Sequence, residues 1–278
     1  MNTATTAPAF LLGTHQPGWL ARAGVPLFVS DWRLRGYRRL PRAAAAWGLD
    51  SGGFSELAEH GSWEHGPTPA QYVARVRRYA HDVGRLLWAA PQDWMVEPFI
   101  LAKTGLTVAE HQARTVANYV QLRELGPDLP FVPVVQGWTT SDYLHCVQRY
   151  ADAGVDLTIA PLVAVGSVCR RQATAEAGAI LAALHAAGIT RLHGFGFKTL
   201  GLARYGHLLA SADSLAWSIA ARRAAPRPGC TRHRNCANCL PYALAWRASL
   251  LAQLRDVAAR GVQPSLFTTT DPACGGVA

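Results

Sequence analysis

The sequence contains almost no lysine and no hydrophobic run long enough to cross a membrane. Only two of its 27 basic Lys and Arg residues are lysines, Lys103 and Lys198. A membrane-spanning helix needs about 20 consecutive apolar residues, and no stretch approaches that length. The apolar segment 7–12 has no basic residue before it, which argues against a secretory signal peptide. The sequence therefore predicts a cytoplasmic protein that does not associate with membranes.

Acidic and basic residues are unevenly distributed along the 278-residue chain, which carries a formal net charge of +9. Residues 214–255 include seven arginines and no Asp or Glu. A GC-rich genome explains the preference for Arg over Lys, but it does not explain this separation from acids. Because guanidinium groups match phosphate geometry, the pattern favours a nucleic-acid partner. The candidates for contacts with its backbone are Arg170, Arg171, Arg222 and Arg223. For the first two, the alternative is a solvated helix start.

Short apolar runs rich in β-forming residues alternate with amphipathic segments of helical length. The expected strands are residues 10–14, 26–30, 47–50, 86–90, 131–136, 157–165, 192–197 and 214–219. The expected helices are residues 68–83, 107–125, 141–153, 172–187 and 200–210. Several runs are apolar throughout, which is typical of strands buried on both faces. The alternation predicts an α/β fold, a parallel (β/α)8 or TIM barrel.

An open, doubly wound α/β sheet is the alternative architecture. Such a sheet usually has a glycine-rich phosphate-binding turn after its first strand, and Leu12-Gly13-Thr14-His15 is not one. The barrel is therefore favoured. No linker rich in Ser, Gly and Pro divides the chain. We expect the barrel over residues 1–228, a C-terminal subdomain with a loop and closing helix over 229–262, and a flexible tail over 263–278.

Polar residues follow most of the expected strands, at the end of a barrel where active sites lie. Asp50 precedes Ser51-Gly52-Gly53-Phe54, Asp93 follows the fourth strand, and Asp213 begins the last one. An Asp at such a position usually caps a helix, but two glycines start helices poorly, so we expect Asp50 to face a ligand. One carboxylate can attack an anomeric carbon while a second moves protons. The aspartates therefore suit glycoside hydrolysis or base exchange on a nucleoside, and spacing alone does not separate the two.

Four residues of metal-binding types lie close together near the end of the chain: Cys230, His233, Cys236 and Cys239. Their spacing predicts a structural, tetrahedral Zn²⁺ site. The other cysteines show no regular spacing and no export signal is present, so disulfides are not expected. His233 is the weakest of the four candidates, because another residue could complete the ligand shell.

Five segments in order, followed by the cysteine cluster, resemble the tRNA-guanine transglycosylases, which are zinc-containing (β/α)8 barrels. The segments are Asp50-Ser51-Gly52-Gly53-Phe54, Val135-Gln136-Gly137, Val163-Ala164-Val165-Gly166-Ser167, His193-Gly194-Phe195-Gly196 and Asp213-Ser214-Leu215-Ala216-Trp217. The similarity spans about residues 10–260. No single segment is decisive, but their order together with the cluster is specific.

The resemblance implies a role for each matching position. Asp213 would be the nucleophile that attacks C1′ and displaces guanine, and Asp50 the acid/base that moves protons between the leaving and entering bases. Asp93 would accept hydrogen bonds from the base, Gln136 would donate to its carbonyl, and Phe54 would stack on its ring. The other substrate-binding positions implied are Ser51, Gly52, Gly137, Ala164, Val165, Gly166 and Gly194.

The short chain, the lack of a C-terminal RNA-binding domain and the histidine inside the cysteine cluster resemble the DpdA group, which inserts 7-deazaguanines into the DNA of bacteria and phages. We therefore expect a pentosyltransferase that exchanges guanine in DNA for preQ0 or a derivative through a covalent Asp-glycosyl intermediate. The alternatives are a compact tRNA-guanine transglycosylase and a non-catalytic, zinc-stabilised barrel that binds nucleic acid. Many members of the family form dimers, so a homodimer is expected.

Overall fold

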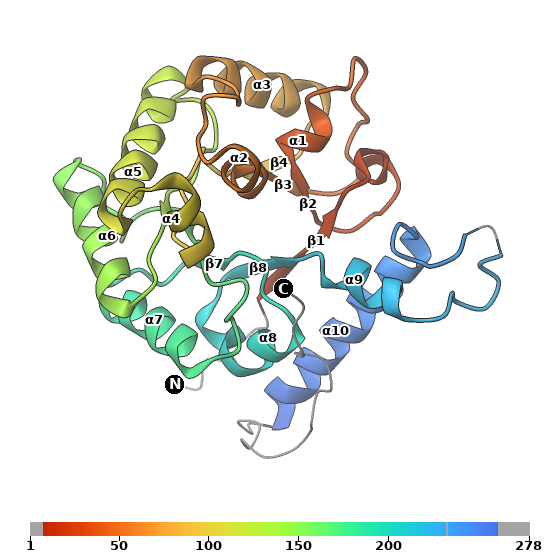
Figure 1. Ribbon diagram of the computed structural model, residues 1–278. Coiled ribbons are helices and arrows are strands. Elements are labelled where there is room, and N and C mark those ends of the chain that lie inside the picture. The colour runs from red at the N-terminus through yellow and green to blue at the C-terminus, as the bar shows by residue number, and fades with distance from the viewer. Residues whose placement is uncertain (1–7, 232, 261–278) are drawn as a thin grey trace.

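The computed structural model describes residues 8–231 and 233–260 (Figure 1). Eight parallel strands form one sheet in the order β4-β3-β2-β1-β8-β7-β6-β5. The sheet curls so that β4 meets the segment just before β5 at an isolated parallel bridge between Ala89 and Phe131. The strands are β1 (Ala9–Thr14), β2 (Leu27–Ser30), β3 (Trp47–Asp50), β4 (Leu86–Ala89), β5 (Val134–Val135), β6 (Val163–Val165), β7 (Leu192–Gly194) and β8 (Ser211–Ser214). The predicted α/β barrel architecture is confirmed.

Helices connect the strands and surround the sheet (Figure 1). They are α1 (Asp31–Leu34), α2 (Gly53–His60), α3 (Pro69–Asp82), α4 (Pro98–Thr104), α5 (Val108–Leu125), α6 (Thr140–Asp152), α7 (Ala175–Ala186), α8 (Thr199–Tyr205), α9 (Ala216–Arg223) and α10 (Leu240–Arg260), with the short 3-10 helices η1 (Pro17–Ala21) and η2 (Gly206–Leu208). Three of them, α3, α5 and α6, begin with a capping box whose threonines are Thr68, Thr107 and Thr139. Each box satisfies backbone N–H groups that the first helical turn leaves free, which explains why these helices start where they do.

Two hydrophobic clusters lie on opposite faces of the sheet. Successive strand residues point to opposite faces, and accordingly Leu12 belongs to the large cluster that packs under the helices, whereas Leu11 packs with Trp88 in a small one. The Trp88 ring on β4 also contacts His193 on β7 at 4.6 Å between ring centroids. Because β4 and β7 are not neighbours in the sheet, this contact crosses the inside of the barrel.

The last strand differs from its prediction. The sequence predicts a strand over residues 214–219, but β8 ends at Ser214 and residues from Ala216 onwards form α9. The Trp217 side chain is buried and its Nε1–H donates to the Gly13 carbonyl at 2.9 Å. The apolar run was misread because α9 buries Trp217, Ser218 and Ala221 along one helical side. Asp213 therefore lies near the end of its strand and not at its start.

The fifth and sixth strands are also shorter than predicted, with two and three residues. Pro133 and Pro161, which have no backbone N–H to donate, lie just before them. The predicted closing helix is α10, which packs against α8 and α9. The segment between α9 and α10, which carries the cysteine cluster, projects away from the barrel in Figure 1. The predicted tail 263–278 lies outside the described residues.

No helix in the described part of the chain combines the length and apolar character needed to span a bilayer.

Candidate active site

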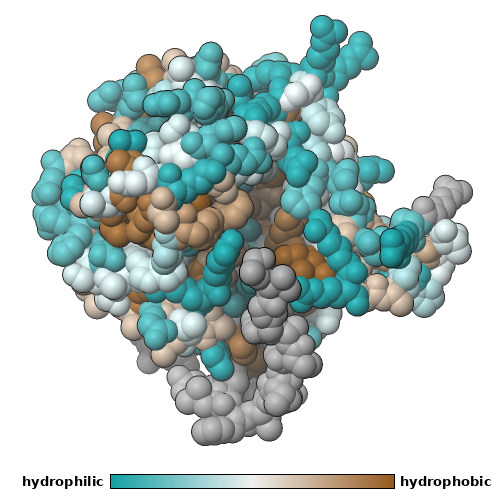
Figure 2. All heavy atoms as spheres, viewed as in Figure 1, coloured by the Kyte–Doolittle hydropathy of each residue, from teal (hydrophilic) through white to brown (hydrophobic). Residues whose placement is uncertain are grey.

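A cavity of about 220 Å³ lies at the carboxyl ends of the strands. In the space-filling view, hydrophobic surface is visible between hydrophilic side chains near the centre of this face (Figure 2). The predicted site residues that line the cavity are Asp50, Phe54, Asp93, Gly166, Arg170 and Asp213. The structure thus brings together the three aspartates that the sequence places far apart.

Asp213 projects from β8 into the cavity and is held by one of its two carboxylate oxygens. Its Oδ1 accepts a hydrogen bond from the Gly196 N–H at 3.0 Å and lies 3.3 Å from His193 Nε2. The Asp213 side chain is only 9% exposed. One oxygen of the Asp213 carboxylate is thus fixed at the cavity wall.

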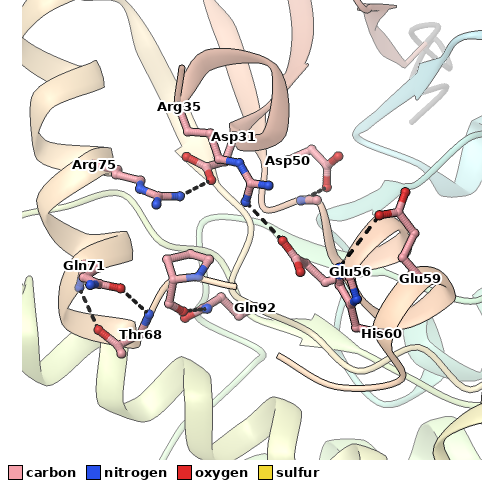
Figure 3. A network of polar contacts seen from close by, with 12 residues as sticks. Asp31, Arg35, Asp50, Glu56, Glu59, His60, Thr68, Gln71, Arg75 and Gln92 are labelled. Atoms are coloured by element: carbon pink, nitrogen blue, oxygen red, sulfur yellow. Dashed lines mark hydrogen bonds and ion pairs between the residues drawn. The ribbon is translucent and has the colours of Figure 1, made fainter. Parts of the chain in front are cut away.

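Asp50 is the last residue of β3, and its Oδ1 accepts a hydrogen bond from the Gly52 N–H at 3.1 Å (Figure 3). Contrary to expectation, the glycine pair does start a helix: α2 begins at Gly53, with Gly52 at the N-cap in the left-handed region (φ +86°). Asp50 itself is not the cap, and it lines the cavity. Burial raises the pKa of Asp50 to about 6, and the negative charge of Asp213 contributes to the rise.

A buried chain of hydrogen bonds supports Asp93. Its Oδ2 accepts from Gln136 Nε2 at 2.6 Å, and Gln136 Oε1 accepts from the Ser167 hydroxyl at 2.7 Å. The Ser167 hydroxyl in turn accepts from the Val96 N–H at 2.9 Å. Burial raises the pKa of Asp93 to about 7, and the neighbouring charge of Asp50 adds to the effect. Gln136 therefore lies behind Asp93, a contact that the sequence did not predict.

Sequence reasoning assigned no role to several residues that line the cavity. Glu97 is buried, lies 3.3 Å from the Ser167 hydroxyl, and has a pKa raised by burial. The signal that could have identified it is its position in the same strand-end loop as Asp93, four residues later. The others are Phe28, Gly53, Met95, Ser167, Cys169, Phe195 and Gly196.

The remaining predicted base-pocket residues do not line the cavity: Ser51, Gly52, Gln136, Gly137, Ala164, Val165 and Gly194. Ala164 and Val165 are fully buried in β6. At Gly137 an added Cβ would come within 2.7 Å of Tyr143, so this glycine allows close packing behind the site. At Gly166, which does line the cavity, a Cβ would collide with the Gln136 amide.

The four predicted backbone-binding arginines lie in different environments. Arg170 is exposed beside the cavity and its guanidinium lies 4.5 Å from the centre of the Phe99 ring. Arg171 is partly buried, with its guanidinium 4.2 Å from the centre of the Trp138 ring. Arg222 and Arg223 are exposed in the last turn of α9. Two other arginines form ion pairs with acidic residues: Arg35 with Glu56 at 3.1 Å, and Arg75 with Asp31 at 2.8 Å (Figure 3).

The four predicted metal ligands lie together between α9 and α10. Their ligand atoms are all within 4.8 Å of one another, with 3.8 Å between the sulfurs of Cys230 and Cys239 and 3.3 Å between His233 Nε2 and the Cys236 sulfur. Tetrahedral zinc with Zn–S bonds of about 2.3 Å places its sulfurs about 3.8 Å apart. The Arg227 N–H lowers the pKa of Cys236 to about 7, which favours the thiolate that binds metals. The cluster could hold a metal ion such as zinc.

A parallel α/β barrel with an acidic cavity at its strand ends and a Cys/His cluster beyond the last strand has the architecture of the tRNA-guanine transglycosylase superfamily. A family model described as DpdA, DeoxyPurine in DNA protein A, matches residues 7–274, nearly the whole chain. The chain belongs to this family. No curated protein matches the chain.

Proposed function

We propose that the protein is a transglycosylase that exchanges guanine in DNA for a 7-deazaguanine such as preQ0. One observation carries the proposal: Asp50 and Asp213 face the same cavity as Asp93, so that an acid/base, a nucleophile and a base-binding carboxylate share one pocket. Membership of a family described as DeoxyPurine in DNA protein A supports DNA as the substrate.

In the first half of the reaction, an oxygen of Asp213 forms a bond to C1′ of the deoxyribose while the bond from C1′ to guanine N9 breaks. The electron pair leaves with the purine, and the Asp50 carboxyl supplies the proton that neutralises it. A pKa near 6 leaves a fraction of Asp50 protonated at neutral pH, which suits this task.

In the second half, the entering 7-deazaguanine gives its N9 proton to the Asp50 carboxylate. Its N9 electron pair then attacks C1′ and breaks the ester bond to Asp213. Two successive displacements at C1′ retain the configuration of the sugar and leave the phosphodiester backbone intact. The regenerated Asp50 carboxyl is ready for the next guanine.

Base recognition is assigned to Asp93, with Phe54 at the mouth of the cavity. A carboxylate at Asp93 accepts hydrogen bonds from the ring N–H and amino group that guanine and 7-deazaguanine share. Gln136 holds Asp93 in position through its 2.6 Å hydrogen bond. Phe54 is 49% exposed, which leaves its ring available for stacking on a base.

The target base must leave the DNA stack to reach Asp213, because the cavity is recessed at the strand ends. Arg170 lies beside the cavity, and we propose that it binds a phosphate of the DNA strand that carries this base. None of the four metal-ligand candidates lines the cavity, and we assign to zinc a structural role in anchoring the segment between α9 and α10. Zinc bound there would crosslink the segment and take no part in the reaction.

The test is mass spectrometry of nucleosides from the DNA and tRNA of cells that express the protein in the presence of preQ0. The expected product is a 7-deazaguanine deoxynucleoside in DNA, absent when Asp213→Ala replaces the wild type. Asp156→Ala is the matched control, since Asp156 lies on an exposed loop, where its side chain accepts hydrogen bonds from Thr158. A modified base in tRNA alone would show a tRNA transglycosylase. Nucleic-acid binding without exchange would show a non-catalytic barrel.

A further inference from the structure

We infer that His193 is a positioning residue for the nucleophile: it holds Oδ1 of Asp213 so that Oδ2 is the oxygen that attacks C1′. The inference rests on the proposed function and adds to it the identity of the attacking atom and the group that selects it. His193 does not line the cavity and has no place in the chemistry described above.

The strand register places His193 between two polar residues of β8. His193 on β7 is the Cα partner of Ser211 on β8. Ser211 and Asp213 are two residues apart on one strand, so their side chains point to the same face of the sheet. The imidazole therefore bridges Ser211 and Asp213 from the neighbouring strand.

Both ring nitrogens of His193 have partners. Nδ1 lies 2.8 Å from the Ser211 hydroxyl, and Nε2 lies 3.3 Å from Asp213 Oδ1. A carboxylate only accepts hydrogen bonds, so Nε2 carries a proton and donates to Asp213. The Ser211 hydroxyl donates to Nδ1 and thereby selects this tautomer.

The ring is fixed in place by an aromatic cage inside the barrel. The His193 side chain is fully buried, and its ring meets those of Trp88, Phe195 and Phe28 at centroid distances of 4.6, 5.1 and 5.9 Å. A ring enclosed in this way cannot turn its nitrogens toward water. The hydrogen bond to Asp213 is therefore preorganised before substrate binds.

The two carboxylate oxygens of Asp213 differ in the hydrogen bonds that they accept. Oδ1 has two donors, the Gly196 N–H and His193 Nε2. Within residues 8–231 and 233–260, no hydrogen bond reaches Oδ2. When Oδ2 attacks C1′, it becomes the ester oxygen, and Oδ1 becomes the ester carbonyl, which keeps its two donors. When the ester breaks in the second half, the charge returns to a carboxylate that the same donors stabilise.

Three substitutions at His193 separate the donor from the packing of the ring. In His193→Gln the side-chain amide extends to the position that Nε2 of the histidine occupies, so a donor to Asp213 remains. In His193→Asn the shorter side chain extends only to the position of Nδ1, so this donor is lost. His193→Phe keeps a ring of similar size without a donor. With a DNA oligonucleotide and no entering base, we expect the Asn and Phe variants to form the protein–DNA adduct about 10- to 100-fold more slowly and the Gln variant to stay near the wild type.

The affinity for the free base, measured with preQ0 by calorimetry, should be unchanged in all three variants, since Asp93 and Gln136 are untouched. Ser211→Ala provides a second, milder variant, because it removes only the partner of Nδ1; we expect a loss of about 3- to 10-fold in adduct formation. The control is His185→Gln, whose Nε2 lies 2.8 Å from the Leu208 carbonyl on the outer ring of helices, and which should form the adduct at the wild-type rate.

Adduct formation at the wild-type rate in the Phe variant would overturn the inference. The inference would also be overturned if the rate of adduct formation fell in proportion to the melting temperature of each variant, regardless of whether its side chain places a donor at the position of Nε2. Failure of the proposed function looks different: Asp213→Ala would then still form the adduct, or the wild type would form none.

Discussion

Gln136 Nε2 lies 2.6 Å from Asp93 Oδ2, and this hydrogen bond links the residue after β5 to the loop after β4. β4 and β5 are the two ends of the described sheet, and only an isolated bridge, Ala89 with Phe131 just before β5, joins them. The bond therefore connects the two ends of the described sheet and at the same time orients the carboxylate of Asp93, the proposed base-binding residue.

Asp93→Asn should change how stability depends on pH. The pKa of Asp93 is raised from 3.8 to about 7, so the folded chain binds this proton more tightly than the unfolded chain, and the free energy of unfolding falls as pH rises between these values. Asn cannot ionise and still accepts a hydrogen bond from Gln136. We expect the stability of the variant relative to the wild type to be greater at pH 8 than at pH 4, by up to about 4 kcal/mol, in urea denaturation.

Asp128→Asn serves as the control for this experiment, because Asp128 is exposed and Arg77 lowers its pKa. The stability of Asp128→Asn relative to the wild type should not be greater at pH 8 than at pH 4. Equal relative stability of Asp93→Asn at the two pH values would contradict the prediction.

The release of guanine should depend on the protonation of Asp50. Its pKa is raised to about 6, and in the proposed reaction the protonated form neutralises the leaving purine. We therefore expect the single-turnover release of labelled guanine to slow as pH rises above about 6. Asp50→Asn should lose this dependence and react about 10²- to 10⁴-fold more slowly. A pH profile unchanged in Asp50→Asn would assign the acid to another residue.

Removal of the metal should unfold the segment between α9 and α10 and destabilise its packing on the barrel. We expect Cys236→Ser and Cys239→Ser to abolish zinc content, measured by plasma mass spectrometry, and a strong chelator to lower the melting temperature of the wild type. Cys169→Ser is the matched control, since Cys169 lies outside the cluster. Full zinc content in Cys236→Ser would remove this residue from the ligand set.

Arg170→Gln should weaken DNA binding through the loss of one phosphate contact. The slope of log K against log salt concentration should become shallower by about 0.7 to 0.9, the contribution of a single phosphate. Arg77→Gln offers a control, because Arg77 is exposed on α3 and already pairs with Asp128. An unchanged slope in Arg170→Gln would place the DNA backbone elsewhere.

The sequence predicted the strands best where both faces are apolar. Trp47 to Leu49 of β3 are fully buried, and burial on both sides leaves an apolar run that is visible without a structure. β8 was misplaced for the opposite reason. Its inner face carries Ser211 and Asp213, so the strand that holds the proposed nucleophile has the weakest apolar signal, and the adjoining helix has a stronger one.

The sequence by itself determined the features that depend on neighbours along the chain. The metal cluster is one, because its four ligands lie within one short segment, and the strand-end position of Asp50 is another. Only the tertiary structure decided which of these groups act together. The contacts of Gln136 with Asp93 and of His193 with Asp213 join residues 43 and 20 positions apart. Such contacts depend on strand register and on the closing of the barrel, which no local pattern of residues encodes.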